Sequence, residues 1–293
     1  MNRGDFSSGT VTSKDGTVVG YRSIGRGPGL LIVQGAMGTI PNYSELAIAL
    51  ADDFTVIVAD RRGRGLTPLP FTPEAAAIER DVDDVDALRE ATGAELLFGL
   101  SSGAIIALES TRMLKGIKKT VLYEPPFYPK GDVPREDIAR VYSEIASDDL
   151  PAAMVTVMGI VKLVPWFVSI LPRPLRELGA SRMLRHQDEN GTAPYASFRE
   201  LLPSMRFDFQ VVAERGGALA SYHDVQTPIL LLGGTKSPAY LTEALDALER
   251  TLPHAGRVVL RGLHHSGPWN RDRGGAPGVV AEQIRSFLRG ERA

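Results

Sequence analysis

The sequence contains no cysteine among its 293 residues, and this absence removes several kinds of chemistry. Without cysteine there can be no disulfide, no thiolate metal ligand and no cysteine nucleophile. An excess of one charge is also missing, because 33 basic residues stand against 35 acidic ones and the formal net charge is −2. Domains that bind nucleic acid usually carry a basic excess. The composition therefore argues against a nucleic-acid partner.

Long hydrophobic runs are missing as well. The most apolar stretch, 154–171, is interrupted by Lys162 and Pro165 and is short for a membrane span. We interpret it as an apolar surface element or a pocket wall and expect no span. Residues 1–6 do not form the apolar core of a signal peptide, so we expect a cytoplasmic location.

What the sequence does contain is a regular alternation of short apolar runs with helix-like segments. After a β-rich pair within 11–24, we expect strands at 30–33, 54–59, 95–100, 119–123, 229–232 and 257–260. We expect helices at 43–51, 72–90, 239–252 and 279–288, and another that begins after residue 101 and reaches about 114. This alternation is typical of the α/β class, in which helices flank a mostly parallel sheet.

The alternation breaks between residues 127 and 225. This stretch has helix-like segments and prolines but no convincing strand. We therefore predict a core domain made of 1–126 and 226–293, with 127–225 as a mainly helical insertion. The chain is long enough for one α/β domain that carries such an insertion.

A G-x-S-x-G motif stands at 99–103, between two apolar runs that predict a strand and a helix. The chain must turn sharply there, and side chains at Gly99 and Gly103 would collide with the turn. The turn holds the Ser101 hydroxyl clear of the sheet at a helix N-terminus, where the Ser102 N–H can meet developing negative charge. We predict a nucleophile elbow at Ser101; the alternative is an ordinary Gly/Ser loop.

The chain resembles an α/β-hydrolase with a helical cap. The resemblance lies in four features in order: Gln34-Gly35-Ala36 after one strand, the Asp60-to-Gly65 loop after the next, the elbow, and a histidine loop after the last strand. It covers the predicted core and not the insertion. It implies a serine hydrolase with a Ser–acid–His triad in that chain order and no cofactor.

The base of such a triad must lie within hydrogen-bond reach of the serine. Only His264 and His265 follow the last predicted strand, and the family's Gly-x-x-His pattern matches His265. The resemblance therefore implies His265 as the base, and we expect His264 to pack or cap the loop. We expect the remaining histidines at the surface: His186, His223 and His254.

The acid departs from the commoner pattern. Many relatives carry Asp after the strand that resumes beyond the cap, but residues 233–238 contain no carboxylate. Glu124 ends the strand after the elbow helix, where ligand-facing groups of parallel sheets gather. Zearalenone lactonases and certain haloalkane dehalogenases take their acid from this position, so the resemblance implies Glu124. The alternative is that Glu124 only caps its strand and takes no part in catalysis. Asp224 is the reserve candidate for the acid, although it precedes its strand.

The resemblance also implies an oxyanion hole built from the backbone N–H groups of Ser102 and Ala36. Relatives often have His-Gly where this chain has Gln34-Gly35, which leaves the Ala36 donor in place. We expect the arginine-rich loop at 60–65 to be structural rather than a substrate contact.

The predicted pocket takes Met37 and three insertion residues, Met158, Trp166 and Phe167, as candidate lining. The alternative is that the insertion residues form the insertion's own core. Four aspartates on the 72–90 helix predict a solvated face rather than a metal site: Asp81, Asp83, Asp84 and Asp86. No metal ligand cluster or phosphate-binding loop occurs, so we expect neither metal nor cofactor.

We therefore expect acyl transfer to water, with cleavage of a carboxylic ester or lactone of a hydrophobic small molecule through an acyl-enzyme. The residues that follow Ser101 resemble those of zearalenone lactonases, which favours a lactone. One alternative is a carbon–carbon bond hydrolase, or a tailoring enzyme of secondary metabolism, on the same triad. The other is a non-catalytic ligand-binding protein, because a fold alone does not decide a function. The oligomeric state stays open.

Overall fold

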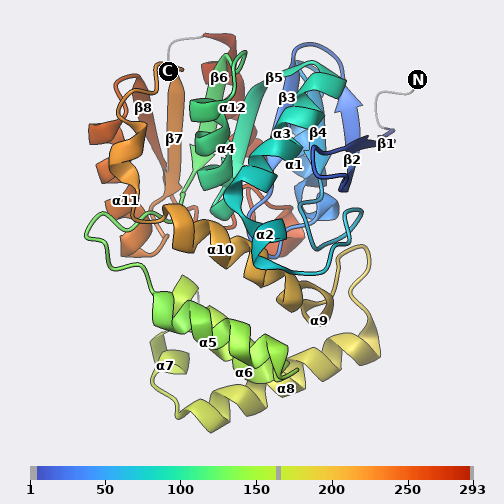
Figure 1. The fold of residues 1–293 in the computed structure, drawn as a ribbon, viewed down its shortest axis with the longest axis vertical. Coiled ribbons are helices and arrows are strands. Elements are labelled where there is room, and N and C mark those ends of the chain that lie inside the picture. The colour runs from blue at the N-terminus through green and yellow to red at the C-terminus, as the bar shows by residue number, and fades with distance from the viewer. Residues whose placement is uncertain (1–4, 163–165, 291–293) are drawn as a thin grey trace.

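An eight-stranded sheet forms the centre of the described chain, residues 5–162 and 166–290 of a computed structural model (Figure 1). The strand order is β1-β2-β4-β3-β5-β6-β7-β8. β2 runs antiparallel to β1 and β4, and all other neighbours are parallel. The strands are β1 (Ser7–Thr12), β2 (Val18–Gly25), β3 (Gly29–Val33), β4 (Thr55–Ala59), β5 (Ala94–Leu100), β6 (Lys119–Tyr123), β7 (Ile229–Gly234) and β8 (Ala255–Leu260).

Helices connect the strands and confirm the predicted α/β class. Outside the insertion they are η1 (Ile40–Tyr43), α1 (Ser44–Leu50), α2 (Pro73–Ala76), α3 (Ile78–Thr92), α4 (Ser102–Met113), α11 (Ala239–Thr251), η4 (Arg271–Arg273) and α12 (Pro277–Arg289). The prediction of one continuous helix at 72–90 was wrong, because the structure has two helices there. Ala77, with ψ of 138°, has extended backbone and separates α2 from α3.

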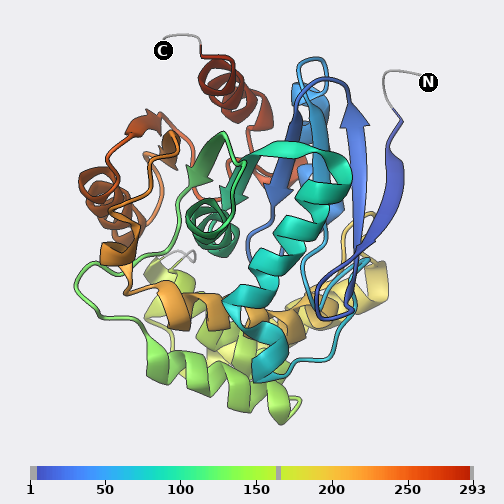
Figure 2. The same ribbon diagram turned by 45° about the horizontal axis from the view of Figure 1, so that its top comes forward.

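The inner strands are buried on both faces, and alternate side chains point to opposite helix layers. Leu30 and Ile32 of β3 share a cluster with residues of α1 and α12, whereas Leu31 and Val33 share one with α3 and α4. Figure 2 shows α12 on the opposite side of the sheet from α3 and α4. Burial of one such aliphatic side chain contributes about 1.5–3 kcal/mol. The pattern makes the sheet a rigid frame for the loops at its edge.

Between β6 and β7 the described residues form helices and no strand. These are α5 (Arg135–Ala146), α6 (Leu150–Val161), α7 (Trp166–Ser169), α8 (Arg173–Asn190), α9 (Phe198–Leu201), η2 (Leu202–Ser204), α10 (Met205–Arg215) and η3 (Leu219–Tyr222). α10 lies against the sheet domain, and α5 to α8 lie farther out (Figure 1). Met205 and Phe209 of α10 join the buried cluster of α4. The insertion is therefore packed onto the edge where the parallel strands end.

The prediction that four aspartates form a solvated face was wrong for two of them. Asp81 and Asp84 are buried and form ion pairs with Arg61 (3.2 Å) and Arg62 (2.6 Å). Burial raises the pKa of Asp84 to about 6, against the opposing effect of Arg62. The i, i+3 spacing of these two aspartates puts both on the inward side of the helix. These two aspartates are therefore buried partners of the arginines and not part of a solvated surface.

Candidate active site

Ser101 occupies a strained turn between β5 and α4. Its φ of 56° and ψ of −126° are rare for a residue with a side chain. A Cβ on Gly99 would lie 2.6 Å from the Ala104 Cα, within the turn itself. A Cβ on Gly103 would lie 2.3 Å from the Gln34 carbonyl oxygen. Both glycines are therefore required, the second because the loop after β3 passes so close.

Glu124 and His265 lie together at the sheet edge, although 141 positions separate them in sequence. The Glu124 Oε2 is 2.7 Å from the His265 Nδ1, and Oε1 accepts from the Gly234 N–H at 2.6 Å. A carboxylate only accepts hydrogen bonds, so it favours the tautomer with the proton on Nδ1. The His265 Nε2 is then left free to accept a proton. Both carboxylate oxygens are engaged, and Glu124 is 1% exposed.

The end of β7 explains how Glu124 reaches the histidine. A Cβ on Gly234 would lie 2.1 Å from the Leu263 carbonyl oxygen, so the histidine loop passes directly over this strand end. β6 and β7 are parallel neighbours, which sets Glu124 beside Gly234. The reserve acid, Asp224, has an 86% exposed side chain that pairs with His223 before β7 begins.

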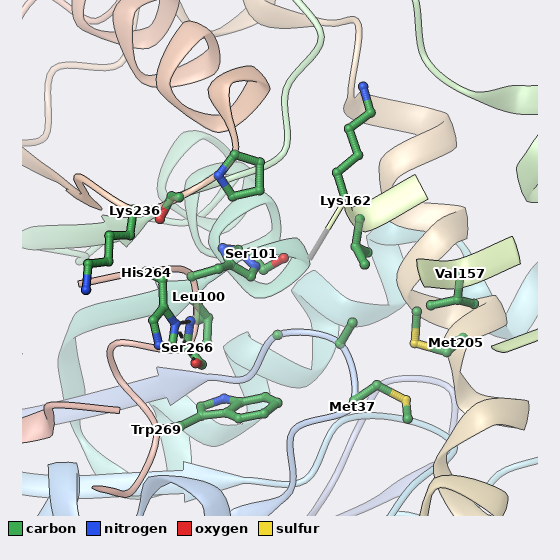
Figure 3. A pocket seen from close by; sticks show the side chains of 16 residues that line it. Met37, Leu100, Ser101, Val157, Lys162, Met205, Lys236, His264, Ser266 and Trp269 are labelled. Carbon is green, nitrogen blue, oxygen red and sulfur yellow. Dashed lines mark hydrogen bonds between the residues drawn. The ribbon is translucent and has the colours of Figure 1, made fainter. Parts of the chain in front are cut away.

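A cavity of about 650 Å³ opens beside these residues, between the sheet edge and the insertion. Ser101 and His265 both line it, although the described residues show no hydrogen bond between their side chains. Such bonds often form only once substrate is bound. Figure 3 shows Ser101 amid the lining side chains, with the amines of Lys162 and Lys236 directed away from it. The rest of the lining is Gly35, Ala36, Met37, Leu100, Val157, Val161, Met205, Ser237, Pro238, His264, Ser266 and Trp269.

The other predicted pocket residues are placed differently. Met37 lines the cavity, but Met158 and Phe167 are not among its described lining residues, and Phe167 is exposed. The side chain of Trp166 lies outside the described part of the chain, so its predicted contact has no description.

Sequence reasoning missed several residues of the cavity wall. Trp269 lies four positions after His265, and that closeness in sequence was a usable signal. Met205 begins α10, and no local pattern distinguishes it from other apolar residues of the insertion. Lys236 stands in the loop where many relatives carry the acid.

The N–H groups of Ala36 and Ser102 are the predicted oxyanion donors. Within the described residues neither N–H donates to a protein acceptor, so both are available to a ligand. Ser102 is the first residue of α4, where the helix dipole favours negative charge. Ala36 lies in the loop after β3 and lines the cavity.

A buried polar network lies behind these two donors. The Asp208 carboxylate, from α10, accepts from the Ser102 hydroxyl at 2.7 Å and from Arg64 at 2.6 Å. Arg64 also donates to the Gly35 carbonyl at 3.0 Å, on the loop that carries Ala36. Arg61 joins the network through Asp208 at 2.5 Å. One insertion carboxylate therefore ties together both predicted donors.

Electrostatics supports an ionised Asp208. Burial alone would raise the pKa of its carboxyl, but Arg64 and Arg61 lower it below the ordinary 3.8. Neither arginine lines the cavity, as expected for a structural loop at 60–65. No group of residues suited to hold a metal ion occurs in the described ranges.

The remaining histidines are engaged locally. The His264 Nδ1 is 2.8 Å from the Ser266 hydroxyl, within the loop that His265 shares. His186 contacts Asn190, and His254 contacts Gln226, both at exposed positions. None of these contacts involves Ser101.

Comparison with known proteins adds a family match. A sequence model described as "Alpha/beta hydrolase family" matches residues 30–282. A 2-(acetamidomethylene)succinate hydrolase of Mesorhizobium japonicum is 25% identical over 250 residues, covering 83% of this chain and 84% of that protein.

Solved structures agree with the fold. An alpha/beta hydrolase from Sphaerobacter thermophilus matches with a TM-score of 0.74 and 27% identity, over 96% of this chain and 100% of that one. An esterase from Rhodococcus sp. matches with a TM-score of 0.64 and 20% identity, over 98% of this chain and 100% of that one. The second likeness is one of fold alone.

Proposed function

The chain belongs to the alpha/beta hydrolase family, and on that premise we propose that it hydrolyses a carboxylic ester or lactone of a hydrophobic small molecule. The observation that carries this proposal is the 2.7 Å contact between Glu124 and His265, beside a cavity that Ser101 also lines. A buried carboxylate on Nδ1 orients an imidazole and stabilises the imidazolium that forms when the ring accepts a proton.

In the proposed mechanism the Ser101 hydroxyl oxygen attacks the substrate carbonyl carbon, and the His265 Nε2 takes the hydroxyl proton. The imidazolium then gives that proton to the leaving alkoxide, which leaves an acyl-enzyme. A water molecule attacks the acyl carbon by the same route and regenerates Ser101. Glu124 stays ionised throughout and holds the ring.

The Ala36 and Ser102 amides bind the oxyanion in this proposal. Each such donor contributes about 10²–10³ in rate, because it is already aimed at the charge that develops. The network of Asp208, Arg61 and Arg64 supports the role, since it holds both backbone segments in place.

The cavity supports a small hydrophobic substrate. Its volume of about 650 Å³ falls within the usual range for small-molecule sites, about 300–1,000 Å³. We assign the helical insertion the role of a cap, because Val157, Val161 and Met205 form one wall. The 2-(acetamidomethylene)succinate hydrolase relative also supports hydrolysis of a small molecule.

The test is the Ser101→Ala variant with p-nitrophenyl esters of graded acyl length. We expect the variant to lose turnover and to lose labelling by a fluorophosphonate probe. Ser221→Ala, at an exposed position far along the chain, is the matched control and should keep both. Ester turnover that persists in Ser101→Ala would refute the proposed nucleophile.

The same experiment separates the two alternatives. A carbon–carbon bond hydrolase would label with the probe but cleave ketone substrates in preference to esters, as product analysis would show. A non-catalytic binding protein would neither label nor turn over either class.

A further inference from the structure

Exposed apolar side chains gather on one short part of the insertion. Five large apolar residues within 167–178 are between 42% and 70% exposed. Together they form what we term the apolar face: Phe167, Ile170, Leu171, Leu175 and Leu178. Clusters of this kind usually mark a binding surface, because a folded chain otherwise keeps such residues apart.

The apolar face lies on α7, on the short link after it that holds Ile170 and Leu171, and on the first turns of α8. Figure 1 places these helices at the outer end of the insertion, away from the sheet and from the two chain ends. The five side chains keep between 42% and 70% of their surface exposed there. The face is thus presented outward on a projecting part of the structure.

Cationic side chains accompany the apolar face. Residues 162–185 contain five basic residues and one acidic one, in a chain whose net charge is −2. Arg173 forms ion pairs with Glu144 and Glu177, whereas Arg182 and Arg185 are exposed and form no ion pair among the described residues. Leu175, Leu178, Arg182 and Arg185 follow the i, i+3, i+7, i+10 spacing of one helix side. Apolar and cationic groups therefore share one surface of α8.

We propose that this surface docks on an anionic lipid bilayer. An anionic bilayer offers an apolar region and negative charge side by side. The apolar face would enter the headgroup boundary while the arginines contact lipid phosphates. The contact would be peripheral, because no helix in the described ranges is long and apolar enough to cross the bilayer. The docking does not depend on which bond the site cleaves.

The apolar face begins close in sequence to the wall of the cavity. Val157, Val161 and Lys162 line the cavity, and α6 ends at Val161. Phe167 of the apolar face follows Lys162 by five positions. Docking would therefore bring the bilayer close to the insertion side of the cavity, where a lipophilic substrate can arrive.

The experiment uses the full chain and sedimentation with vesicles. One set of vesicles contains phosphatidylcholine alone, and the other contains phosphatidylcholine mixed with phosphatidylglycerol. We expect markedly tighter binding to the mixed vesicles, weakened by added salt because salt screens exposed charges. The double variant Arg182→Glu/Arg185→Glu should bind mixed vesicles at least about 20-fold more weakly, since each basic residue contributes about five-fold.

Substitutions in the apolar face test the apolar contribution to vesicle binding. Ile170→Glu and Leu175→Glu should each weaken binding to mixed vesicles by about ten-fold, since each removes a buried aliphatic contact. Val259→Glu is the matched control, because Val259 of β8 is 51% exposed but lies outside the face. It should bind as the unmodified chain does. Circular dichroism checks that each variant is folded.

Three results would overturn the proposal. One is equal binding to the two kinds of vesicle, and another is equal loss in Val259→Glu and Leu175→Glu. The third comes from light scattering: a dimer that Leu175→Glu dissociates, with no vesicle binding, would assign the face to a second copy of this chain.

Discussion

Replacing Glu124 with glutamine tests the proposed chemistry at a single atom. In the structure one carboxylate oxygen accepts from the Gly234 N–H at 2.6 Å and the other contacts the His265 Nδ1 at 2.7 Å. An amide has only one acceptor oxygen, so Glu124→Gln cannot satisfy both donors.

Each orientation of the new amide has a cost. If the amide oxygen keeps the Gly234 contact, the amide NH₂ donates to Nδ1 and forces the His265 proton onto Nε2. The protonated Nε2 can then no longer accept the Ser101 proton. If the amide flips, the Gly234 N–H faces a donor and stays unsatisfied in the interior, which costs about 1–3 kcal/mol. We expect the first orientation and a fall in kcat of about 10³–10⁴, equal to about 4–5.5 kcal/mol of transition-state stabilisation.

The assay is steady-state ester hydrolysis, with kcat and KM determined separately. KM should change little, because Glu124 does not line the cavity. Asp224→Asn is the control, since this exposed carboxylate was the other candidate acid. The substitution should leave kcat and KM unchanged. A Glu124→Gln enzyme that keeps more than about a tenth of kcat would refute the assignment of the acid.

The remaining predictions concern stability. Gly103→Ala should lower the free energy of unfolding measured with urea by about 1–3 kcal/mol, because its Cβ would lie 2.3 Å from a backbone oxygen. Gly159→Ala in α6, where a Cβ meets nothing within 4 Å, should raise stability by about 0.5–1 kcal/mol. Asp208→Asn should cost about 3–5 kcal/mol at neutral pH, because it leaves two buried arginines without their shared carboxylate. The folded pKa of Asp208 is depressed, so its contribution is present above the unfolded value of 3.8 and lost as pH falls through the lower folded value. Urea midpoints of the two chains should therefore converge only below pH 3.8, and convergence at higher pH would contradict the assigned ion pairs.

Local patterns in the sequence were sufficient for the fold class. Continuous apolar runs marked the strands buried on both faces, and the glycines around Ser101 marked the turn from β5 into α4. These features depend on residues close together in the chain, because backbone sterics and the periodicity of side chains act over a few positions. The division into core and insertion rests on the same kind of signal.

The sequence also indicated which residues to examine in the site, because parallel strands end at one edge. It could not decide how Glu124 approaches His265, since that depends on the neighbouring strand β7 and on the loop that crosses Gly234. The roles of these residues remain predictions.

Only the tertiary structure decided which charges are buried and which walls enclose the cavity. Asp81 looked solvated by composition, but packing turned it toward Arg61, and α10 carried Asp208 into the same network. Met205 faces the cavity for a similar reason, because α10 packs against the sheet domain. The contacts of Asp208 with Arg61, Arg64 and Ser102 join residues more than a hundred positions apart. No short-range pattern encodes them, since they arise from the way whole helices pack on the sheet.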